Sequence, residues 1–274
     1  MLFRNKTILI TGASRGIGKA IGLKLASQGA NIVIASKSVE ENPKLGGTIY
    51  SAADEMKAAG GNALAVQCDI RFEDQIQHAV DKAVETFGGI DVLINNASAI
   101  TLQKTEALEP KRYDLMFDIN VRGTIMVSRA CIPHLKRSGS AHILNLSPPL
   151  NMKPKWFRNH LAYTISKYDM TLIALGLAEE LRGANIACNT LWPATTIATA
   201  AVQNLLGGDA LIKMSRKPAI MADAAFEILK RDHLFTGNTC IDELILKEAG
   251  IQNFDEYAVV PGAKLYPDLF IDPA

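Results

Sequence analysis

A tyrosine and a lysine stand four residues apart in the segment YTISK, at Tyr163 and Lys167. If this segment is helical, the two side chains share one face, because positions i and i+4 are neighbours on a helix. A free phenol has a pKa of about 10 and exchanges protons poorly at neutral pH, whereas an adjacent cation favours the phenolate and lowers that pKa. The spacing therefore predicts a tyrosine that gives and takes a proton beside a lysine that tunes it.

Two further polar residues could serve the same chemistry. Ser147 follows the apolar run HILNL, where a buried strand would end, and its hydroxyl could hydrogen-bond a substrate carbonyl. Asn120 lies in FDINVRG, at the start or a kink of a long predicted helix. Simpler interpretations stay open for both: Asn120 could chiefly stabilise a helix bend, and Ser147 could only cap a strand.

The segment TGASRGIG, residues 11–18, follows an apolar run and opens a helical pattern. Gly12 permits a backbone turn that a Cβ would block. Gly16 and Gly18 would let a phosphate group and the helix approach the strand closely, and free N–H groups at a helix start favour an anion. Glycines lodged between a strand and a helix predict a dinucleotide-phosphate site.

The glycine spacing GxxxGxG after a threonine, followed in order by Asn120, Ser147, Tyr163 and Lys167, resembles the short-chain dehydrogenase/reductase family. The resemblance implies an oxidoreductase in which Tyr163 gives a proton to a carbonyl oxygen as hydride arrives, and the reverse for alcohol oxidation. It also implies that Ser147 polarises the carbonyl and that Lys167 lowers the tyrosine pKa and hydrogen-bonds the nicotinamide ribose. Asn120 would hold a water on the proton path.

Charges near the second predicted strand indicate which dinucleotide binds. An NAD site usually has an acidic residue at the end of that strand, but here Ser36 stands there with Lys37 beside it. The missing carboxylate removes repulsion toward a 2′-phosphate, and Arg15 and Lys37 can supply positive charge. NADP(H) is therefore the expected cofactor, with NAD(H) as the alternative.

The resemblance also implies a wider set of cofactor-binding positions, in the glycine turn and after several predicted strands. Besides Arg15, Ser36, Lys37, Tyr163 and Lys167, they are Gly12, Ser14, Gly16, Ile17, Gly18, Asp69, Ile70, Asn95, Ala97, Pro193, Thr196 and Thr199. Two neighbouring positions depart from the family pattern, because Ser98 and Ala194 stand where the family usually has glycine.

The composition excludes several classes of protein. The 274 residues include 29 Lys and Arg against 28 Asp and Glu, a formal charge of +1, which argues against a nucleic-acid binder with a basic surface. No apolar stretch reads as a signal peptide or as a membrane span of about 20 residues. The four cysteines are far apart and lie in no metal or redox motif, which predicts reduced thiols in a cytoplasmic protein without a metal site.

Short apolar runs alternate with helical patterns along the whole chain. The expected strands are residues 6–11, 31–35, 63–67, 92–95, 142–146, 186–191 and 239–241, and the expected helices are residues 17–28, 50–59, 73–87, 111–137, 161–182 and 222–230. This alternation predicts an α/β fold, a Rossmann-type doubly wound parallel sheet of about seven strands with helices on both faces.

One domain covering residues 1–274 is the simplest organisation, because the glycine turn and the tyrosine–lysine pair must meet one cofactor. Residues 199–217 are apolar and lie where the family carries a substrate lid. Residues 250–274 contain aromatic side chains at a spacing that fits an ordered arm packed on the domain.

These features predict a hydride-transferring enzyme for a small-molecule substrate that is apolar or lipid-like, since the expected lid is apolar. Two alternatives stay open: a ketoacyl-thioester reductase, and a dinucleotide-binding protein with a mainly regulatory role. A hydrolase triad built on Ser147 is not favoured, because no GxSxG motif surrounds that serine. The resemblance implies a homodimer or homotetramer paired through the helices at 111–137 and 161–182, and neither nucleic acid nor a membrane span is expected.

Overall fold

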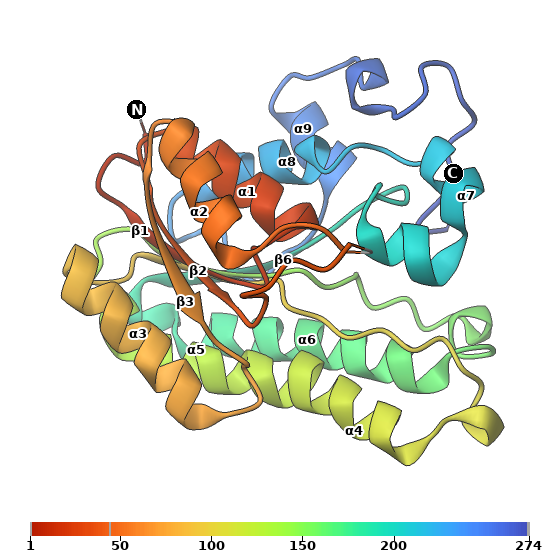
Figure 1. Cartoon of the computed structure of the whole chain (residues 1–274), viewed down its shortest axis with the longest axis horizontal. Coiled ribbons are helices and arrows are strands. Elements are labelled where there is room, and N and C mark those ends of the chain that lie inside the picture. The colour runs from red at the N-terminus through yellow and green to blue at the C-terminus, as the bar shows by residue number, and fades with distance from the viewer. Residues whose placement is uncertain (1, 44, 273–274) are drawn as a thin grey trace.

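A parallel sheet of seven strands forms the centre of the computed structural model, which describes residues 2–43 and 45–272 (Figure 1). The strand order is β3-β2-β1-β4-β5-β6-β7. The strands are β1 (Thr7–Thr11), β2 (Asn31–Ser36), β3 (Asn62–Gln67), β4 (Val92–Asn95), β5 (Ala141–Asn145), β6 (Ile186–Trp192) and β7 (Thr239–Ile241). The chain winds from β1 outward to β3, and then from β4 outward to β7. This reversal leaves a crevice outside the carboxyl ends of β1 and β4, as in other doubly wound sheets.

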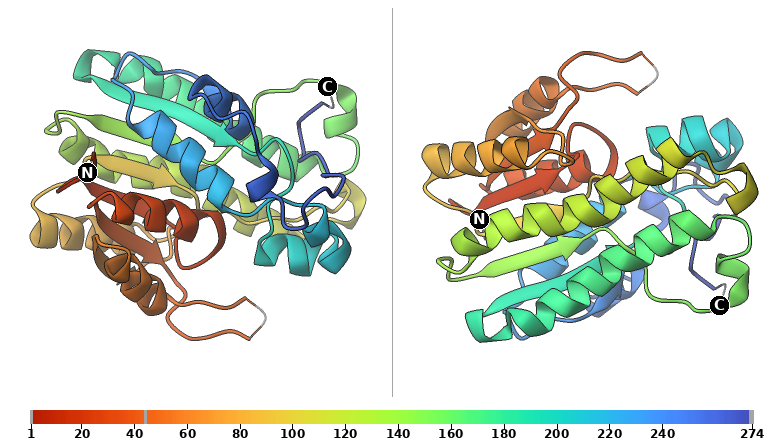
Figure 2. Two further views of the ribbon diagram at one scale, coloured as in Figure 1. Left: turned by 90° about the horizontal axis from the view of Figure 1, so that it is seen from above. Right: turned by 90° about the horizontal axis from the view of Figure 1, so that it is seen from below.

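Helices cover both faces of the sheet, as Figures 1 and 2 show. One face carries α1 (Gly16–Ser27), α2 (Ile49–Ala58), α8 (Ala219–Leu229) and α9 (Asp242–Glu248). The other carries α3 (Glu73–Phe87), α4 (Pro110–Phe117), α5 (Thr124–Leu135) and α6 (Leu161–Glu180). The short helix α7 (Gly208–Lys213) lies beyond the carboxyl edge of the sheet, within the segment expected to be a lid. The predicted fold class is confirmed.

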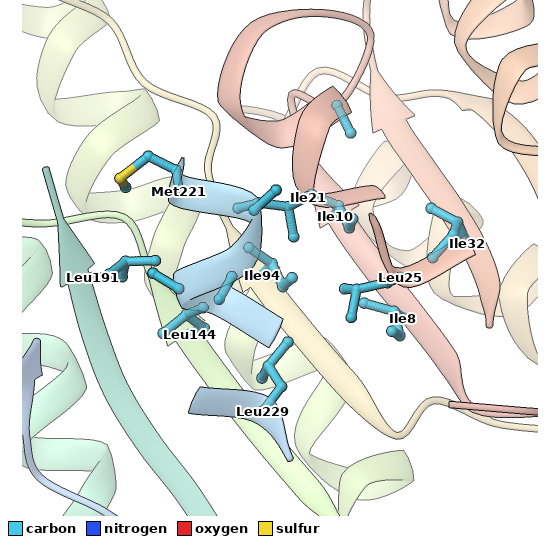
Figure 3. Packing of buried hydrophobic residues seen from close by; sticks show 14 of the residues in the cluster. Ile8, Ile10, Ile21, Leu25, Ile32, Ile94, Leu144, Leu191, Met221 and Leu229 are labelled. Atoms are coloured by element: carbon cyan, nitrogen blue, oxygen red, sulfur yellow. The ribbon is translucent and has the colours of Figure 1, made fainter. Parts of the chain in front are cut away.

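The strands are apolar on both faces because both faces are buried. On one side, Ile8, Ile10 and Ile94 of the sheet pack against Ile21 and Leu25 of α1 and against residues of α8 such as Met221 and Leu229 (Figure 3). Burying an aliphatic side chain of this size contributes about 1.5–3 kcal/mol. The packing fixes the strand ends, and with them the residues that follow each strand.

The helices differ from their expected form in two main respects. The helix expected at residues 111–137 is interrupted by a wider π-type turn, η2 (Asp118–Gly123), which separates α4 from α5. Helices α7 and α9 were not anticipated from the sequence. In the described part of the chain, no helix combines the length and apolar character that crossing a membrane requires.

The last described segment, residues 250–272, has little regular structure beyond the short turn η6 (Asp255–Tyr257), yet it is tied to the rest of the molecule. An isolated bridge pairs Pro267 with Thr195, and Tyr266 N donates to Met214 O at 2.9 Å. This segment, hereafter the C-terminal arm, runs back over the carboxyl edge of the sheet (Figure 2).

Candidate active site

The residues that follow β1, β4, β5 and β6 meet at the carboxyl edge of the sheet. Parallel strands in register bring their ends together there, as the pairing of Ile10 with Ile94 and of Asn95 with Asn145 illustrates. The glycine turn comes after β1, and Ser147 lies two residues beyond β5. The edge therefore gathers the candidate phosphate-binding turn and a candidate catalytic hydroxyl from distant parts of the sequence.

The glycine turn has the conformation that a close-approaching ligand needs. Gly12 and Gly16 have φ of +68° and +58°, which disfavour any residue with a Cβ. A Cβ on Gly12 would stand 3.0 Å from Ala97 Cα, so the turn also packs tightly against the end of β4. Helix α1 begins directly after the turn without a capping side chain or an acidic residue in its first turn. Its first N–H groups can therefore receive an anion, and the turn fits a dinucleotide phosphate.

Asn96 holds this turn in place, a role that the sequence reading did not assign. Its Nδ2 donates to Thr11 O at 2.8 Å and to Gly12 O at 3.0 Å. In return, the amides of Asn96 and Ala97 both donate to Thr11 Oγ1 at 3.0 Å. The neighbouring predicted residue Asn95 points elsewhere, into a buried network with Asn145 and Ser128.

A cavity of about 610 Å³ opens at the start of α1. Its walls are the glycine turn with Arg15 and Gly16, the loop after β2 with Pro43 and Leu45, and the lid segment with Thr199 and Gln203. Thr199 lies near the turn, since a Cβ on Gly16 would be 3.6 Å from its Cγ2. Three segments that are distant in sequence thus border an open cavity along the first turns of α1.

The end of β2 carries no acidic side chain. Ser36 is buried, with its hydroxyl 3.4 Å from that of Ser14 in the glycine turn. Arg15 donates a hydrogen bond to Ser38, two residues beyond the strand, and Lys37 is exposed. The positive charges named from the sequence therefore lie on either side of the strand end.

Asp69, which follows β3, is already engaged by a neighbour. Arg71 binds its carboxylate through Nε at 3.0 Å and Nη2 at 2.6 Å, and this bonding holds the pKa of Asp69 below its ordinary value. The next residue, Ile70, is buried, and a Cβ on Gly123 would lie only 2.7 Å from its Cδ1. Both residues are thus fixed by protein contacts at the β3 edge of the crevice.

Tyr163 and Lys167 lie in the first two turns of α6, as their spacing predicts. Both are almost fully buried. The Tyr163 hydroxyl makes no hydrogen bond to any of the described residues, and it is not sealed from solvent, since it is absent from the buried unpaired groups. A buried phenol whose oxygen has no protein partner can form a hydrogen bond with a ligand.

Three groups contact or lie near the Lys167 ammonium. Its Nζ donates to Leu146 O at 2.6 Å, contacts Met170 Sδ at 3.2 Å and lies 5.1 Å from the centre of the Trp192 ring. Burial lowers the pKa of Lys167 to about 7. The ammonium form therefore depends on the charges around it, rather than being assured as it would be on the surface.

The sequence predicts a lowered pKa for Tyr163, but the protein's own groups do not lower it. Burial raises the pKa of the Tyr163 phenol above its ordinary value, and the negative charge of Asp268 raises it further. Removing a phenol from water disfavours its charged form, and a nearby negative charge does the same. In the protein alone, Tyr163 is consequently a neutral proton donor at physiological pH.

Ser147 is fully buried beside Thr171 of α6. The Thr171 hydroxyl lies 2.9 Å from Ser147 Oγ and 2.7 Å from Pro148 O. These contacts orient the serine hydroxyl from the helix that also carries Tyr163 and Lys167. Thr171 was not identified from the sequence, although its position eight residues after Tyr163 puts it near the same helix face.

Asn120 lies in the π-type turn η2, so the interruption of the long helix falls where a kink was expected. Its Oδ1 accepts from Ala99 N at 2.8 Å and from Ser98 Oγ at 3.1 Å. Its Nδ2 donates to Ala99 O at 2.9 Å and to Ser166 Oγ at 3.1 Å. The side chain thus joins the segment after β4 to α6, and Ser98, in place of the usual glycine, adds one of these bonds.

The segment after β6 carries the last predicted cofactor residues. Pro193 follows Trp192 directly. Both backbone polar groups of the next residue are bonded: Ala194 N donates to Asp242 Oδ1 at 2.8 Å, and Ala194 O accepts from Asp268 N at 3.1 Å. The Thr196 hydroxyl lies 2.8 Å from that of Ser215 and is therefore engaged within the lid segment.

The C-terminal arm adds residues to the site that no sequence spacing indicated. The Phe270 ring stacks on Tyr163 with centroids 6.3 Å apart, and Leu269 O accepts from Trp192 Nε1 at 2.9 Å. Asp268 precedes them and acts electrostatically on both Tyr163 and Lys167. The aromatic spacing of the arm was the one available signal, and it indicated only that the arm is ordered.

Comparisons with known proteins agree with this geometry. The family model for short chain dehydrogenases matches residues 6–208. Hydroxysteroid dehydrogenase-like protein 2 of Bos taurus is 60% identical over 266 residues, which are 97% of this chain and 63% of that protein. The chain therefore spans less than two thirds of the length of that relative.

Solved structures show the same fold. A putative dehydrogenase from Xanthomonas campestris is 50% identical, with a TM-score of 0.96 and coverage of 100% of both chains. A metagenomic short-chain oxidoreductase in complex with NADP is 25% identical, with a TM-score of 0.73 over 88% of this chain and 98% of its own. A short chain dehydrogenase from Mycobacterium paratuberculosis bound to NAD, at 22% identity and a TM-score of 0.74 over 88% of this chain and 97% of its own, shares the fold.

Proposed function

Because the chain belongs to the short-chain dehydrogenase family, we propose that it transfers hydride between a nicotinamide dinucleotide and a carbonyl/alcohol pair, with Tyr163 as the proton donor and acceptor. The observation that carries this proposal is the Tyr163 hydroxyl. This hydroxyl makes no hydrogen bond to the described residues, and Tyr163 lies beside Lys167 on α6. The same helix contacts Ser147 through Thr171, at the edge of the sheet where the glycine turn also lies. A pure binding module needs no such arrangement of phenol, ammonium and hydroxyl.

The glycine turn fits a dinucleotide phosphate, which indicates the residues that would hold the cofactor. The first N–H groups of α1 would receive the phosphates, and Arg15 and Lys37 would face the adenosine end. A bound reduced nicotinamide would supply the hydride. The other groups that the reaction needs are side chains of the protein.

In carbonyl reduction, Tyr163 gives its proton to the oxygen that becomes the alcohol. Its raised pKa suits this direction, since the phenol is protonated at neutral pH. Ser147, whose hydroxyl is oriented by Thr171, would hydrogen-bond the same oxygen and stabilise the charge that develops on it. The Lys167 ammonium would favour the phenolate that remains after proton transfer. Asn120 would hold the segment after β4 in place against α6.

NADP(H) is the cofactor we propose as preferred. Ser36 leaves the end of β2 without the carboxylate that would repel a 2′-phosphate, and Arg15 lies on the glycine turn beside it. The NADP held by the metagenomic relative supports this choice, and the NAD held by the mycobacterial structure keeps NAD(H) as the alternative. An apolar or lipid-like substrate is supported by the apolar surroundings of Tyr163, which packs in one hydrophobic cluster with Trp192 and Phe270.

We further propose one domain made of the sheet, lid and arm, because the arm shares backbone hydrogen bonds with the lid segment. The exposed Ile125 and Leu172, on α5 and α6, support pairing of two copies through these helices. All four cysteines are buried free thiols, which supports a reducing compartment such as the cytoplasm.

A substrate screen tests the proposed function directly. The wild-type protein is mixed with NADPH and with ketones, aldehydes or acyl thioesters, both short and long in their apolar part, and oxidation of the nicotinamide is followed by absorbance. We expect turnover with ketones or aldehydes that carry an apolar body. Turnover confined to acyl thioesters would favour a ketoacyl-thioester reductase, and cofactor binding without any turnover would favour the regulatory alternative.

A further inference from the structure

The C-terminal arm is fixed over the reaction centre by Phe270. This side chain is 1% exposed, and its ring contacts five other rings with centroids 5.2 to 6.3 Å apart. The five belong to Trp156, His160, Tyr163, Tyr168 and Trp192. Phe270 also has φ of +71°, a backbone conformation that costs an aromatic residue on the order of 1 kcal/mol and persists only where the surroundings impose it.

Polar contacts hold the arm on both sides of Phe270. Asn151 donates to Phe270 O at 3.1 Å and to Asp272 Oδ2 at 2.9 Å, and Lys153 pairs with Asp272 at 2.7 Å. Before Phe270, Asp268 N donates to Ala194 O at 3.1 Å, and Leu269 O accepts from Trp192 Nε1 at 2.9 Å. The position of Asp268 is therefore determined by its neighbours on either side.

These contacts bring the arm residues that follow Asp268 against the surroundings of both catalytic candidates of α6. Trp192, which binds the carbonyl of the next arm residue, lies with its ring 5.1 Å from Lys167 Nζ, and Phe270, two residues along the arm, stacks on Tyr163. The Asp268 carboxylate accepts one hydrogen bond, from Leu269 N at 2.7 Å, through Oδ1.

The Lys167 ammonium lacks a contacting counter-charge. Its neighbours are a carbonyl, a thioether and an aromatic ring, so in the described ranges no carboxylate touches it. A buried ammonium without a balancing charge gives up its proton. The negative charge of Asp268 opposes this loss and raises the pKa of Lys167. Burial raises the pKa of Asp268 itself to about 7, and the charge of Lys167 opposes that rise.

We propose that Asp268 is a positioning residue of the reaction centre: its carboxylate is the counter-charge that keeps Lys167 an ammonium ion beside Tyr163. The assignment rests on the proposed function, since it acts through the lysine of that site. It also gives the arm a role, because the buried Phe270 ring and the bonds of Asp268 N and Leu269 O hold the carboxylate in place.

Other charged groups around Asp268 are part of the same arrangement. Asp242, at the start of α9, is fully buried; it raises the pKa of Asp268 and is itself acted on by Arg216. Arg216 in turn pairs with Glu243. His160, which contacts the Phe270 ring, has its pKa lowered by burial and is neutral at physiological pH. Lys167 and Tyr163 complete the set, and Asp268 and Lys167 titrate as a coupled pair.

The test measures Lys167 itself, without substrate or cofactor. The protein is labelled with isotopic carbon at lysine Cε, and the Lys167 signal is identified by its loss in Lys167→Arg and followed by NMR as a function of pH. We expect Asp268→Asn to lower the Lys167 titration midpoint by about one pH unit or more. Asparagine keeps the acceptor for Leu269 N, and Asp268→Glu, which keeps the charge, should restore the midpoint in large part.

Asp272→Asn is the matched control, because it weakens the arm contacts to Lys153 without changing the charge near Lys167. It should leave the Lys167 midpoint unchanged and lower the melting temperature. An unchanged midpoint in Asp268→Asn, or an equal shift in Asp272→Asn, would overturn the proposal.

Kinetics with a substrate then separate the two proposals. If the reaction uses Lys167 as proposed, Asp268→Asn moves the alkaline limb of the kcat/KM profile to lower pH and reduces kcat more than it changes KM. A shifted NMR midpoint with an unchanged kinetic profile would retain Asp268 as the counter-charge of Lys167 but contradict the proposed function.

Discussion

The side chains of the candidate site divide into those whose polar atoms the protein has already bonded and those that it leaves free. Asn120 is bonded at both ends, to Ala99, Ser98 and Ser166. The Tyr163 hydroxyl, in contrast, makes no bond within the described residues. Bonded groups should govern stability and free groups turnover, so single substitutions can distinguish the two.

Replacing Asn120 by alanine should destabilise the protein. The change leaves Ala99 N and Ala99 O without their buried partner, and each unsatisfied group costs about 1–3 kcal/mol. We expect the free energy of unfolding of Asn120→Ala, measured with urea, to fall by about 2–4 kcal/mol. Asn159→Ala, at an exposed asparagine, should stay within about 0.5 kcal/mol of wild type, and equal losses in both variants would refute the structural role of Asn120.

At the scale of single elements, most of the sheet could be predicted from the sequence. Residues 92–95 and 239–241 are strands with the expected bounds, β5 begins and ends one residue before the expected bounds, and the other strands differ by one residue at one end. Continuous apolar runs are distinctive because both faces of the sheet are buried. The split between α4 and α5 could be placed only as a start or kink at Asn120, since the π-type turn depends on hydrogen bonds from Asn120 to the segment after β4.

The cofactor preference belongs to the elements around the end of β2. We expect NADPH to bind more tightly than NADH, and Arg15→Gln to weaken NADPH binding about tenfold or more, because a hydrogen bond to a charged group contributes about 1.5–3 kcal/mol. Titration by nicotinamide fluorescence gives both dissociation constants. NADH affinity should change little in the variant.

Lys19→Gln is the matched control for this measurement. Lys19 lines the same cavity, but its charge is paired with Glu55 at 2.6 Å. The ratio of NADPH to NADH affinity should therefore stay near that of wild type. Equal affinities of wild type for the two dinucleotides would remove the role given to Arg15.

At the scale of the whole molecule, the contacts that the sequence could not indicate are those between segments far apart in the chain. Asp268 and Phe270 meet Lys167 and Tyr163 only because the chain returns over the carboxyl edge of the sheet after α9. No periodicity or short spacing records such a return. Family motifs located Ser147, Tyr163 and Lys167, whereas the raised pKa of Tyr163 depends on burial to which the arm contributes, and only the packed structure contains it.

The pH dependence of stability should reveal a buried neutral histidine in the sheet. Burial lowers the pKa of His142 to about 4, so below about pH 6.5 the unfolded state takes up a proton that the native state does not. Stability from this residue is thus complete above pH 6.5 and is lost as the pH falls toward 4, by about 3 kcal/mol in total.

His142→Gln isolates this contribution from the buried carboxyls, Asp242 and Asp268, whose raised pKa values act in the opposite direction. In urea titrations, the stability of wild type relative to His142→Gln should decline as the pH falls from about 6.5 to 4. His78→Gln, at an exposed histidine, should show no such trend. A constant difference between wild type and His142→Gln across this range would show that His142 titrates normally.

The central claim, that Tyr163 passes the proton of the reaction, is tested most directly by Tyr163→Phe, measured for folding, cofactor binding and turnover in one preparation. The lost hydroxyl has no hydrogen bond within the described residues, so the melting temperature and the dissociation constant for NADPH should stay near wild type. Turnover of a substrate found in the screen should fall by about 100- to 10,000-fold, the usual contribution of a positioned acid–base group. Turnover near the wild-type rate would contradict the account.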